Sequence, residues 1–232
     1  MTGTKLQRVA VALDTDDRDT FSRWCGLFGP RVGVLKVGPR VFLRWGRDAV
    51  REAAATGADV FLDMKFHDIP STVAGAVGAA KELGVTYLTV HAGGGRRMLE
   101  AAAEEAGDDV RVLGITVLTH LSADDLQDLD LPGTAGDRVL SWARSAKAAG
   151  CAGVVCSPLE LATLRARLGP ELLLVSPGIR FDSRAGDDDQ RRVASPSSAL
   201  GAGADLLVIG RPLTRAADPE AALAALAEAC DQ

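Results

Sequence analysis

Short apolar runs alternate with longer amphipathic segments along this chain. The runs are rich in Val, Leu and Ile, and each has the length of a buried strand. We expect strands at residues 9–13, 33–37, 60–65, 87–90, 110–117, 153–156, 172–176 and 206–209. The intervening segments repeat their apolar positions with the period of a helix that covers a core. The clearest helical patterns are at residues 41–56, 72–83, 97–106 and 137–149.

The ends of these helices have the expected residues. Ser195 followed by Pro196 is typical of a helix start, with Ser as the N-cap and Pro at the first helical position. Glycines that follow the predicted helices are candidates to end them, because glycine adopts the left-handed conformation of a helix stop. They are Gly57, Gly84, Gly107, Gly150 and Gly169.

Eight strands alternating with about eight helices in 232 residues favour an α/β fold, a single (β/α)8 TIM barrel spanning residues 1–232. An open doubly wound sheet is the alternative. Two connections are longer than a barrel needs, at residues 121–135 and 179–194. Long loops in compact domains are often lids or binding loops, so both connections are candidates for such a role.

Composition excludes several classes of function. The net charge of −5 leaves no basic footprint for nucleic acid, and no apolar run is long enough to cross a membrane. The N-terminal residues show no signal-peptide pattern, so we expect a cytoplasmic protein. The four cysteines lack a metal or redox spacing and are expected to be free thiols. The three histidines are equally scattered, and no metal site is predicted.

Lysine is rare in this chain, which makes its positions informative. Of the 26 basic residues only five are Lys, so the other 21 are Arg. Lys36 and Lys65 nevertheless stand at the ends of two apolar strands. Lys can give away a proton that Arg retains, so a Lys at such a place suggests chemistry rather than generic surface charge.

The stretch VFLDMKFHDIPST, residues 60–72, ends an apolar strand with three charges. Strand alternation places Phe61, Asp63 and Lys65 on one face, which is the barrel interior if Val60 and Leu62 face the helices. The plain interpretation is an inward ion pair, with Asp68 capping the next helix. The functional interpretation is an ammonium held charged by flanking carboxylates and positioned as a proton donor.

Other polar groups follow other strands, where the active sites of barrels lie. The strand ends also supply Asp14, Thr119, Ser157, Gly178, Arg180, Gly210 and Arg211. The loops after strands seven and eight often bind phosphate, which favours that role for Arg180 and Arg211. Asp14 could instead cap a helix, and His91 with the following glycines is more typical of a tight turn.

These motifs resemble those of the orotidine 5′-phosphate decarboxylase family. The third-strand segment has that family's D-x-K-x-x-D-I-P core with a Thr shortly after it. The segments VALD, LKVG, HAGGG, TVLTH, VVCSP, SPGIR, DDDQ and VIGRP follow in the family's order over nearly the whole chain. The D-x-K-x-x-D part is shared with related decarboxylases and aldolases, whereas its combination with DIP, GIR, Gln190 and the late GR is highly specific.

The resemblance implies a homodimeric (β/α)8 barrel that converts orotidine 5′-monophosphate to UMP and CO2, the last step of de novo pyrimidine synthesis, without metal or cofactor. Lys65 would protonate C6 of the pyrimidine, and Asp63 would lie beside the departing carboxylate with Lys65 and Lys36. By the same resemblance, Asp14 and Lys36 would bind the ribose, and Thr119 and Ser157 would contact the nucleotide. The phosphate would be held by Arg180, Gln190, Gly210 and Arg211, with residues 179–190 as the active-site lid that closes over the site. Asp68, Ile69 and Thr72 would reach into the partner subunit's site.

Two other functions compete with this one. A metal-dependent sugar-phosphate decarboxylase or aldolase of the same superfamily would resemble the chain at strand three. Such enzymes carry an acidic metal ligand at the end of strand two, where this chain has Lys36. A non-catalytic barrel that binds a phosphoribosyl group is the second rival, and the intact set of Asp63, Lys65 and Asp68 argues against it.

Overall fold

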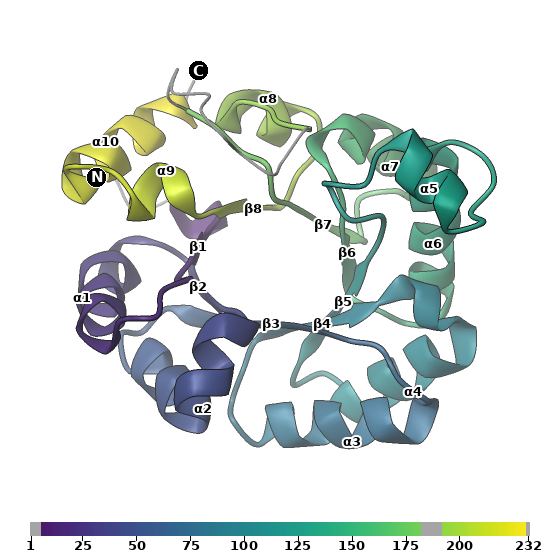
Figure 1. Cartoon of the computed structure of the whole chain (residues 1–232), viewed down its shortest axis with the longest axis horizontal. Coiled ribbons are helices and arrows are strands. Elements are labelled where there is room, and N and C mark those ends of the chain that lie inside the picture. The colour runs from purple at the N-terminus through teal and green to yellow at the C-terminus, as the bar shows by residue number, and fades with distance from the viewer. Residues whose placement is uncertain (1–5, 182–191, 231–232) are drawn as a thin grey trace.

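A computed structural model of the chain describes residues 6–181 and 192–230. Its parallel strands close into a barrel in chain order, each paired with the next, as Figure 1 shows. The strands are β1 Val9–Ala12, β2 Val34–Val37, β3 Asp59–Phe66, β4 Tyr87–His91, β5 Arg111–Ile115, β6 Gly153–Val155, β7 Leu173–Ser176 and β8 Leu206–Ile209. The predicted (β/α)8 barrel is therefore confirmed. The alternative of an open sheet is wrong, because β8 pairs with β1 through Val9 and Leu207.

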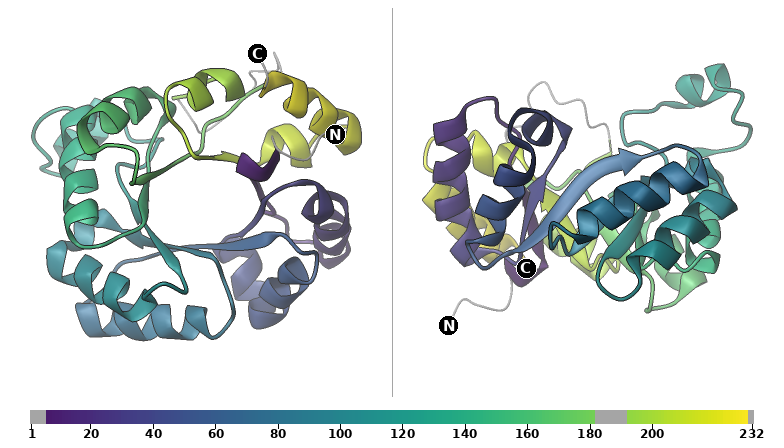
Figure 2. Two further views of the ribbon diagram at one scale, coloured as in Figure 1. Left: turned by 180° about the vertical axis from the view of Figure 1, so that it is seen from behind. Right: turned by 90° about the horizontal axis from the view of Figure 1, so that it is seen from below.

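Helices surround the barrel on its outside (Figures 1 and 2). They are α1 Arg18–Phe28, α2 Pro39–Ala54, α3 Pro70–Lys81, α4 Arg96–Ala106, α5 Ala123–Asp128, α6 Ala135–Ala148, α7 Leu161–Leu168, α8 Pro196–Gly201, α9 Arg211–Thr214 and α10 Pro219–Ala229. Short 3-10 turns lie at Leu6–Arg8, Gly29–Arg31, Ala92–Gly94 and Pro158–Glu160. In the described part of the chain, no helix is both long and apolar enough to span a bilayer.

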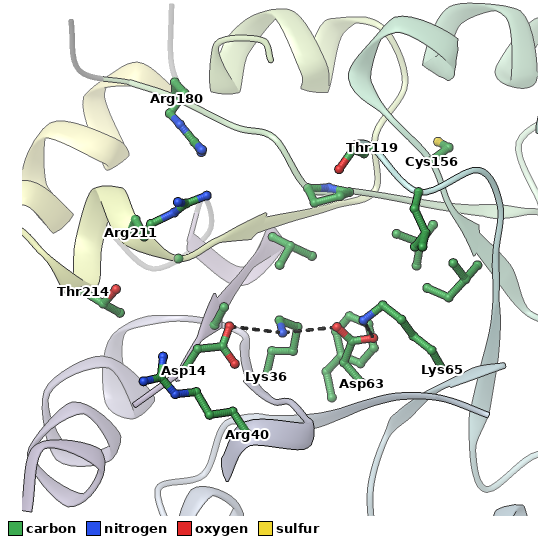
Figure 3. Close-up of a pocket in the computed structure, with 18 of the residues that line it drawn as sticks. Asp14, Lys36, Arg40, Asp63, Lys65, Thr119, Cys156, Arg180, Arg211 and Thr214 are labelled. Atoms are coloured by element: carbon green, nitrogen blue, oxygen red, sulfur yellow. Dashed lines mark hydrogen bonds and ion pairs between the residues drawn. The ribbon is translucent and has the colours of Figure 1, made fainter. Parts of the chain in front are cut away.

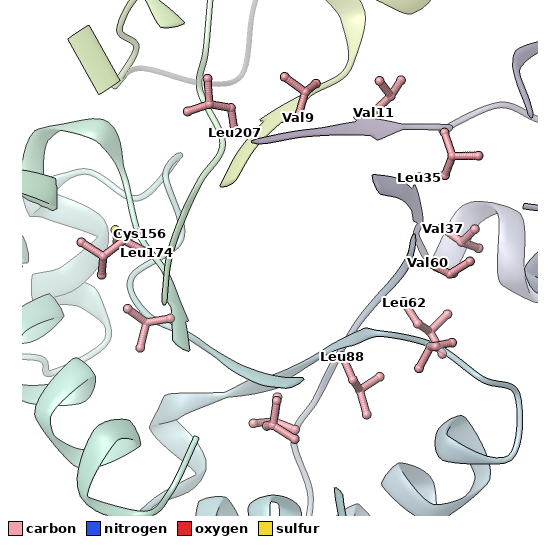
Figure 4. Packing of buried hydrophobic residues seen from close by; sticks show 14 of the residues in the cluster. Val9, Val11, Leu35, Val37, Val60, Leu62, Leu88, Cys156, Leu174 and Leu207 are labelled. Atoms are coloured by element: carbon pink, nitrogen blue, oxygen red, sulfur yellow. The ribbon is translucent and has the colours of Figure 1, made fainter. Parts of the chain in front are cut away.

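The core has two layers because successive strand residues face opposite sides of the sheet. Outward residues such as Val60, Leu62 and Leu88 pack against the helices, as Figure 4 shows for part of this layer. Inward residues, among them Phe61 and Tyr87, fill the barrel. The predicted orientation of the third strand is therefore confirmed, and it directs Asp63 to the interior face.

One expected loop contains a helix. Residues 121–135 include α5, whose first turn is closed by a reciprocal capping box between Ser122 and Asp125. The side chain of Ser122 accepts from the backbone N–H of Asp125, and the Asp125 carboxylate accepts from the backbone N–H of Ser122. Leu126 is buried beneath this turn. The S-x-x-D pattern is a sequence signature of a helix start, so the helix in this loop can be predicted from the sequence.

Candidate active site

A cavity of about 510 Å³ opens at the carboxyl ends of the strands (Figure 3). Most of the predicted site residues line it, although they come from distant parts of the chain. They are Asp14, Lys36, Asp63, Lys65, Thr119, Arg180, Gly210 and Arg211. Parallel strands deliver their carboxyl ends to the same rim of a barrel, which explains why these scattered residues meet.

Four of these residues form a row of alternating charge along one wall of the cavity (Figure 3). Lys36 Nζ lies 3.8 Å from Asp14 Oδ2 and 3.2 Å from Asp63 Oδ2. The other carboxylate oxygen of Asp63, Oδ1, lies 2.8 Å from Lys65 Nζ. Asp63 therefore bridges the two ammonium groups, one through each oxygen.

Burial makes these charge interactions strong. The side chains of Lys36 and Asp63 are only 9% and 12% exposed. Burial by itself opposes ionisation of Asp63, but the ammonium groups of Lys36 and Lys65, with hydrogen bonds from Lys65 and Thr89, lower the pKa of Asp63 to about 2. Burial likewise disfavours the charged form of Lys36, yet the nearby Asp63 and Asp14 carboxylates outweigh it and raise the pKa of Lys36. Asp63 is thus an anion at neutral pH.

The backbone of β3 is irregular where it carries these groups. Leu62 pairs with Leu88 and Phe66 pairs with Val90, so β3 advances four residues while β4 advances two. Two extra residues of β3 are therefore accommodated between these pairs. Lys65 lies inside this bulge with φ of 52°, a left-handed conformation that is costly for a residue with a side chain. Such strain is typical of functional positions.

Arg180 and Arg211 line the cavity away from Lys65, as Figure 3 shows. Arg180 follows β7 and its Nη1 donates to the carbonyl of Ile179 at 2.7 Å. Arg211 opens the short helix α9, directly after Gly210. Two guanidinium groups at one end of the cavity, with an ammonium and a carboxylate at the other, suit an elongated ligand that carries an anionic group at a distance from its reacting atom.

Four of the predicted residues that the structure describes do not line this cavity, and three of them lie at the start of α3. Asp68, Ile69 and Thr72 are exposed where α3 begins, and Ile69 is 64% exposed. The interpretation of Asp68 as the cap of α3 is wrong, because the N-cap position is Ile69 and no side chain caps this helix end. Asp68 Oδ1 instead accepts from the neighbouring N–H of Ile69 at 2.6 Å.

Other predicted residues have local partners or fall outside the structure. Ser157 is fully buried, and its hydroxyl accepts from the N–H of Leu159 at 3.2 Å. His91 forms the expected tight turn by accepting from the N–H of Gly93 through Nδ1 at 3.1 Å. Asp14 is not the cap of α1, since Asp17 accepts from the N–H of Thr20 there. Residues 182–190 of the candidate lid at residues 179–190, Gln190 among them, lie outside the described residues.

Sequence reasoning missed several residues of the site. Arg40, Cys156, Thr214 and Arg215 line the cavity. Each lies within a few residues of a predicted site residue, in LKVGPR, VVCS or GRPLTR, so proximity to a strand end was the available signal. Thr89 on β4 was also missed, and its hydrogen bonds connect it to both Asp63 and Lys65. Only the register between β3 and β4 brings Thr89 to them.

Comparisons with known proteins agree with this geometry. A model of the orotidine 5′-phosphate decarboxylase / HUMPS family matches residues 7–226. Relatives named orotidine 5′-phosphate decarboxylase include one from Thermobifida fusca, 50% identical over 94% of both chains. Another, from Chromobacterium violaceum, is 51% identical over 94% of this chain and 89% of its own length.

Solved structures show the same fold. The crystal structure of orotidine 5′-phosphate decarboxylase from Lactobacillus acidophilus superposes with a TM-score of 0.84 at 36% identity, covering 97% of this chain and 99% of its own. A Geobacillus kaustophilus protein described as uncharacterized superposes with a TM-score of 0.82 at 33% identity. The barrel and the charges at its strand ends agree with these similarities. The chain therefore belongs to the orotidine 5′-phosphate decarboxylase / HUMPS family.

Proposed function

We propose that this protein decarboxylates orotidine 5′-monophosphate to UMP, with Lys65 as the proton donor and without metal or cofactor. The family and the relatives named above support the activity and its place in pyrimidine synthesis. The single observation that carries the mechanism is the contact of 2.8 Å between Lys65 Nζ and Asp63 Oδ1 at the wall of the cavity. It fixes an ammonium group against a carboxylate that stays ionised.

The chemistry requires a fixed cation. When the bond between C6 and the carboxylate breaks, CO2 leaves and its bonding electron pair stays on C6 as a carbanion. An ammonium already in place stabilises that charge without reorganising solvent. Lys65 then transfers a proton from Nζ to C6, which gives UMP and a neutral amine that water reprotonates. One side chain performs both tasks.

The rest of the substrate is assigned to the remaining polar groups. Arg180, Arg211 and Gly210 would hold the 5′-phosphate, because guanidinium groups and backbone N–H groups suit phosphate oxygens. Asp14 and Lys36 would contact the ribose hydroxyls, and Thr119 the nucleotide. Binding energy from the phosphate, which takes no part in bond breaking, can then lower the barrier at C6.

We infer that the protein works as a homodimer with shared active sites. Asp68, Ile69 and Thr72 do not line the cavity of their own chain and are exposed where β3 leads into α3. An isoleucine that is 64% exposed beside a carboxylate suits a surface that another subunit covers. These residues are assigned to the cavity of the partner subunit.

Lys36 argues against the rival function of a metal-dependent sugar-phosphate decarboxylase or aldolase of the same superfamily. Its ammonium is buried at the end of β2 and donates a hydrogen bond to Asp63 Oδ2 at 3.2 Å. A divalent cation beside that carboxylate would meet the charge of Lys36 at close range, which is unfavourable in a buried site. The proposal therefore keeps Asp63 as a partner of the two lysines rather than as a metal ligand.

One assay tests the proposal. The purified protein is mixed with orotidine 5′-monophosphate in the presence of a chelator, and loss of the substrate is followed by ultraviolet absorbance. We expect turnover for the wild type and none for Lys65→Ala, which should still bind UMP because the phosphate and ribose contacts remain. Orotidine, which lacks the phosphate, should react far more slowly. Turnover of Lys65→Ala within about tenfold of wild type would refute the assignment of Lys65.

A further inference from the structure

Thr89 connects the two residues on which the proposed chemistry depends. It lies on β4 and is fully buried, with 0% exposure. Its Oγ1 donates to Asp63 Oδ1 at 2.9 Å and accepts from the backbone N–H of Lys65 at 2.9 Å. The same Asp63 oxygen accepts from Lys65 Nζ at 2.8 Å. A small closed network thus joins the hydroxyl, the carboxylate, the ammonium and the Lys65 backbone.

The network occurs where the sheet is irregular. In the bulge of β3, a side-chain hydroxyl from β4 accepts the N–H of Lys65. Lys65 also holds its left-handed φ of 52°, which persists only when surrounding contacts compensate for its cost. A hydroxyl has one donor hydrogen and two lone pairs, so Thr89 can accept from the backbone and donate to the carboxylate at the same time.

We propose that Thr89 is a positioning residue, whose hydroxyl holds the Lys65 bulge and the Asp63 carboxylate in one arrangement and thereby aims the Lys65 ammonium into the cavity. It acts through these two residues and not by touching substrate. Its expected effect on turnover rests on the proposed function of Lys65. Its effect on the Lys65 backbone rests on the geometry alone.

The kinetic test compares Thr89→Val with Thr89→Ser. Valine keeps the shape of threonine but can neither donate nor accept, whereas serine keeps the hydroxyl and loses only a methyl group. We expect Thr89→Val to lower kcat roughly ten- to a hundredfold with KM changed less than about threefold, because small misplacements of a catalytic group are costly for the chemical step. Thr89→Ser should retain kcat within about threefold of wild type.

Thr116→Val is a matched control for the general loss of a buried hydroxyl. Thr116 is also 0% exposed, and its Oγ1 donates to the carbonyl of Val155 at 2.7 Å rather than to Asp63. This variant should lower the Tm while leaving kcat unchanged. If Thr116→Val loses as much kcat as Thr89→Val, or if Thr89→Val keeps kcat within about threefold of wild type, the proposal is overturned.

Hydrogen exchange at the Lys65 amide gives a readout that does not depend on the reaction. Exchange should be faster in Thr89→Val than in wild type or Thr89→Ser, because the N–H loses its acceptor. If the wild type fails to decarboxylate the nucleotide, the proposed function falls, and this exchange difference still decides whether Thr89 holds the bulge. Unchanged exchange in Thr89→Val refutes the inference even when the enzyme is active.

A second pair of variants covers the case in which Thr89→Val does not fold. Thr89→Ala and Thr89→Ser both remove the methyl group and differ only in the hydroxyl, so the space left by the methyl is common to both. Thr89→Ser should then exceed Thr89→Ala in kcat by roughly tenfold or more and exchange the Lys65 amide more slowly. Equal values for the pair would overturn the proposal.

Discussion

Asp63 is the residue at which the charges of the site meet. Each of its oxygens contacts a different lysine, and Oδ1 also accepts from Thr89. A buried carboxylate is tolerated only when partners compensate for its lost hydration. Asp63 therefore contributes to the stability of the fold as well as to the proposed chemistry, and the two roles can be measured separately.

We predict that Asp63→Asn lowers the free energy of unfolding at pH 7 by about 3 kcal/mol. This is the low end of the range for breaking a buried ion pair, because Lys36 retains Asp14 as a partner. Denaturant unfolding followed by circular dichroism measures the change. Asp14→Asn is the control: that side chain is 48% exposed, so its removal should cost less than about 1 kcal/mol.

The stability difference between wild type and Asp63→Asn should also depend on pH. The pKa of Asp63 is depressed in the folded state, so its contribution is complete above the unfolded value of 3.8 and is lost as pH falls toward about 2. The stability difference between wild type and Asp63→Asn should therefore shrink over that window. A difference that stays constant with pH would contradict the role of the Asp63 charge.

At the scale of elements, helix α2 has a break in its backbone that the helical pattern of its sequence does not predict. Gly46 has φ of 52° and ψ of −131° within Pro39–Ala54, so the helix is divided into two short halves. The first half starts directly after β2 and carries Arg40, which lines the cavity. Only glycine adopts this conformation without strain, so the path of α2 beside the site depends on one residue.

We predict that Gly46→Ala lowers the free energy of unfolding by about 1–3 kcal/mol through backbone strain alone. A Cβ at Gly46 would meet no atom within 4 Å, so steric overlap does not contribute. Gly26 in α1 is the matched control, since its Cβ also meets nothing and its backbone is ordinary helix. Gly26→Ala should raise stability by roughly 0.5–1 kcal/mol. Thermal and denaturant unfolding would test both variants. If both substitutions changed the free energy of unfolding in the same direction, the argument from backbone strain would be refuted.

At the scale of the whole molecule, the cavity and the exposed start of α3 belong to one chain but are proposed to serve two different sites. We predict that Lys65→Ala and Asp68→Ala are each inactive as homodimers and that mixing them restores activity. In a heterodimer, one site has both mutations and the other has neither, so up to about half of the wild-type activity per dimer should return.

The mixing experiment needs proof that subunits exchange. Differently tagged variants purified through both tags supply it. Recovered activity would support a shared site. If isolated heterodimers remain inactive, Asp68 acts within its own chain and the shared arrangement is wrong.

The sequence by itself was sufficient for the barrel, for the inward face of β3 and for most of the charged residues discussed at the cavity. Strand and helix periods are local properties, and any closed parallel sheet gathers its strand ends at one rim. Asp63, Lys65 and Arg211 could therefore be assigned to one site from their places in the chain. The capping box of Ser122 shows that α5, within the predicted loop at residues 121–135, also has a local sequence signal.

Only the tertiary structure decided how these groups are held. The bulge that gives Lys65 its left-handed backbone depends on the register between β3 and β4, as does the contact of Thr89 with Asp63. Register is set by the packing of the whole sheet, and no local pattern encodes it here. Likewise, Asp68 lies only three residues beyond Lys65 but outside the cavity lined by Lys65, because the chain turns between the end of β3 and the start of α3.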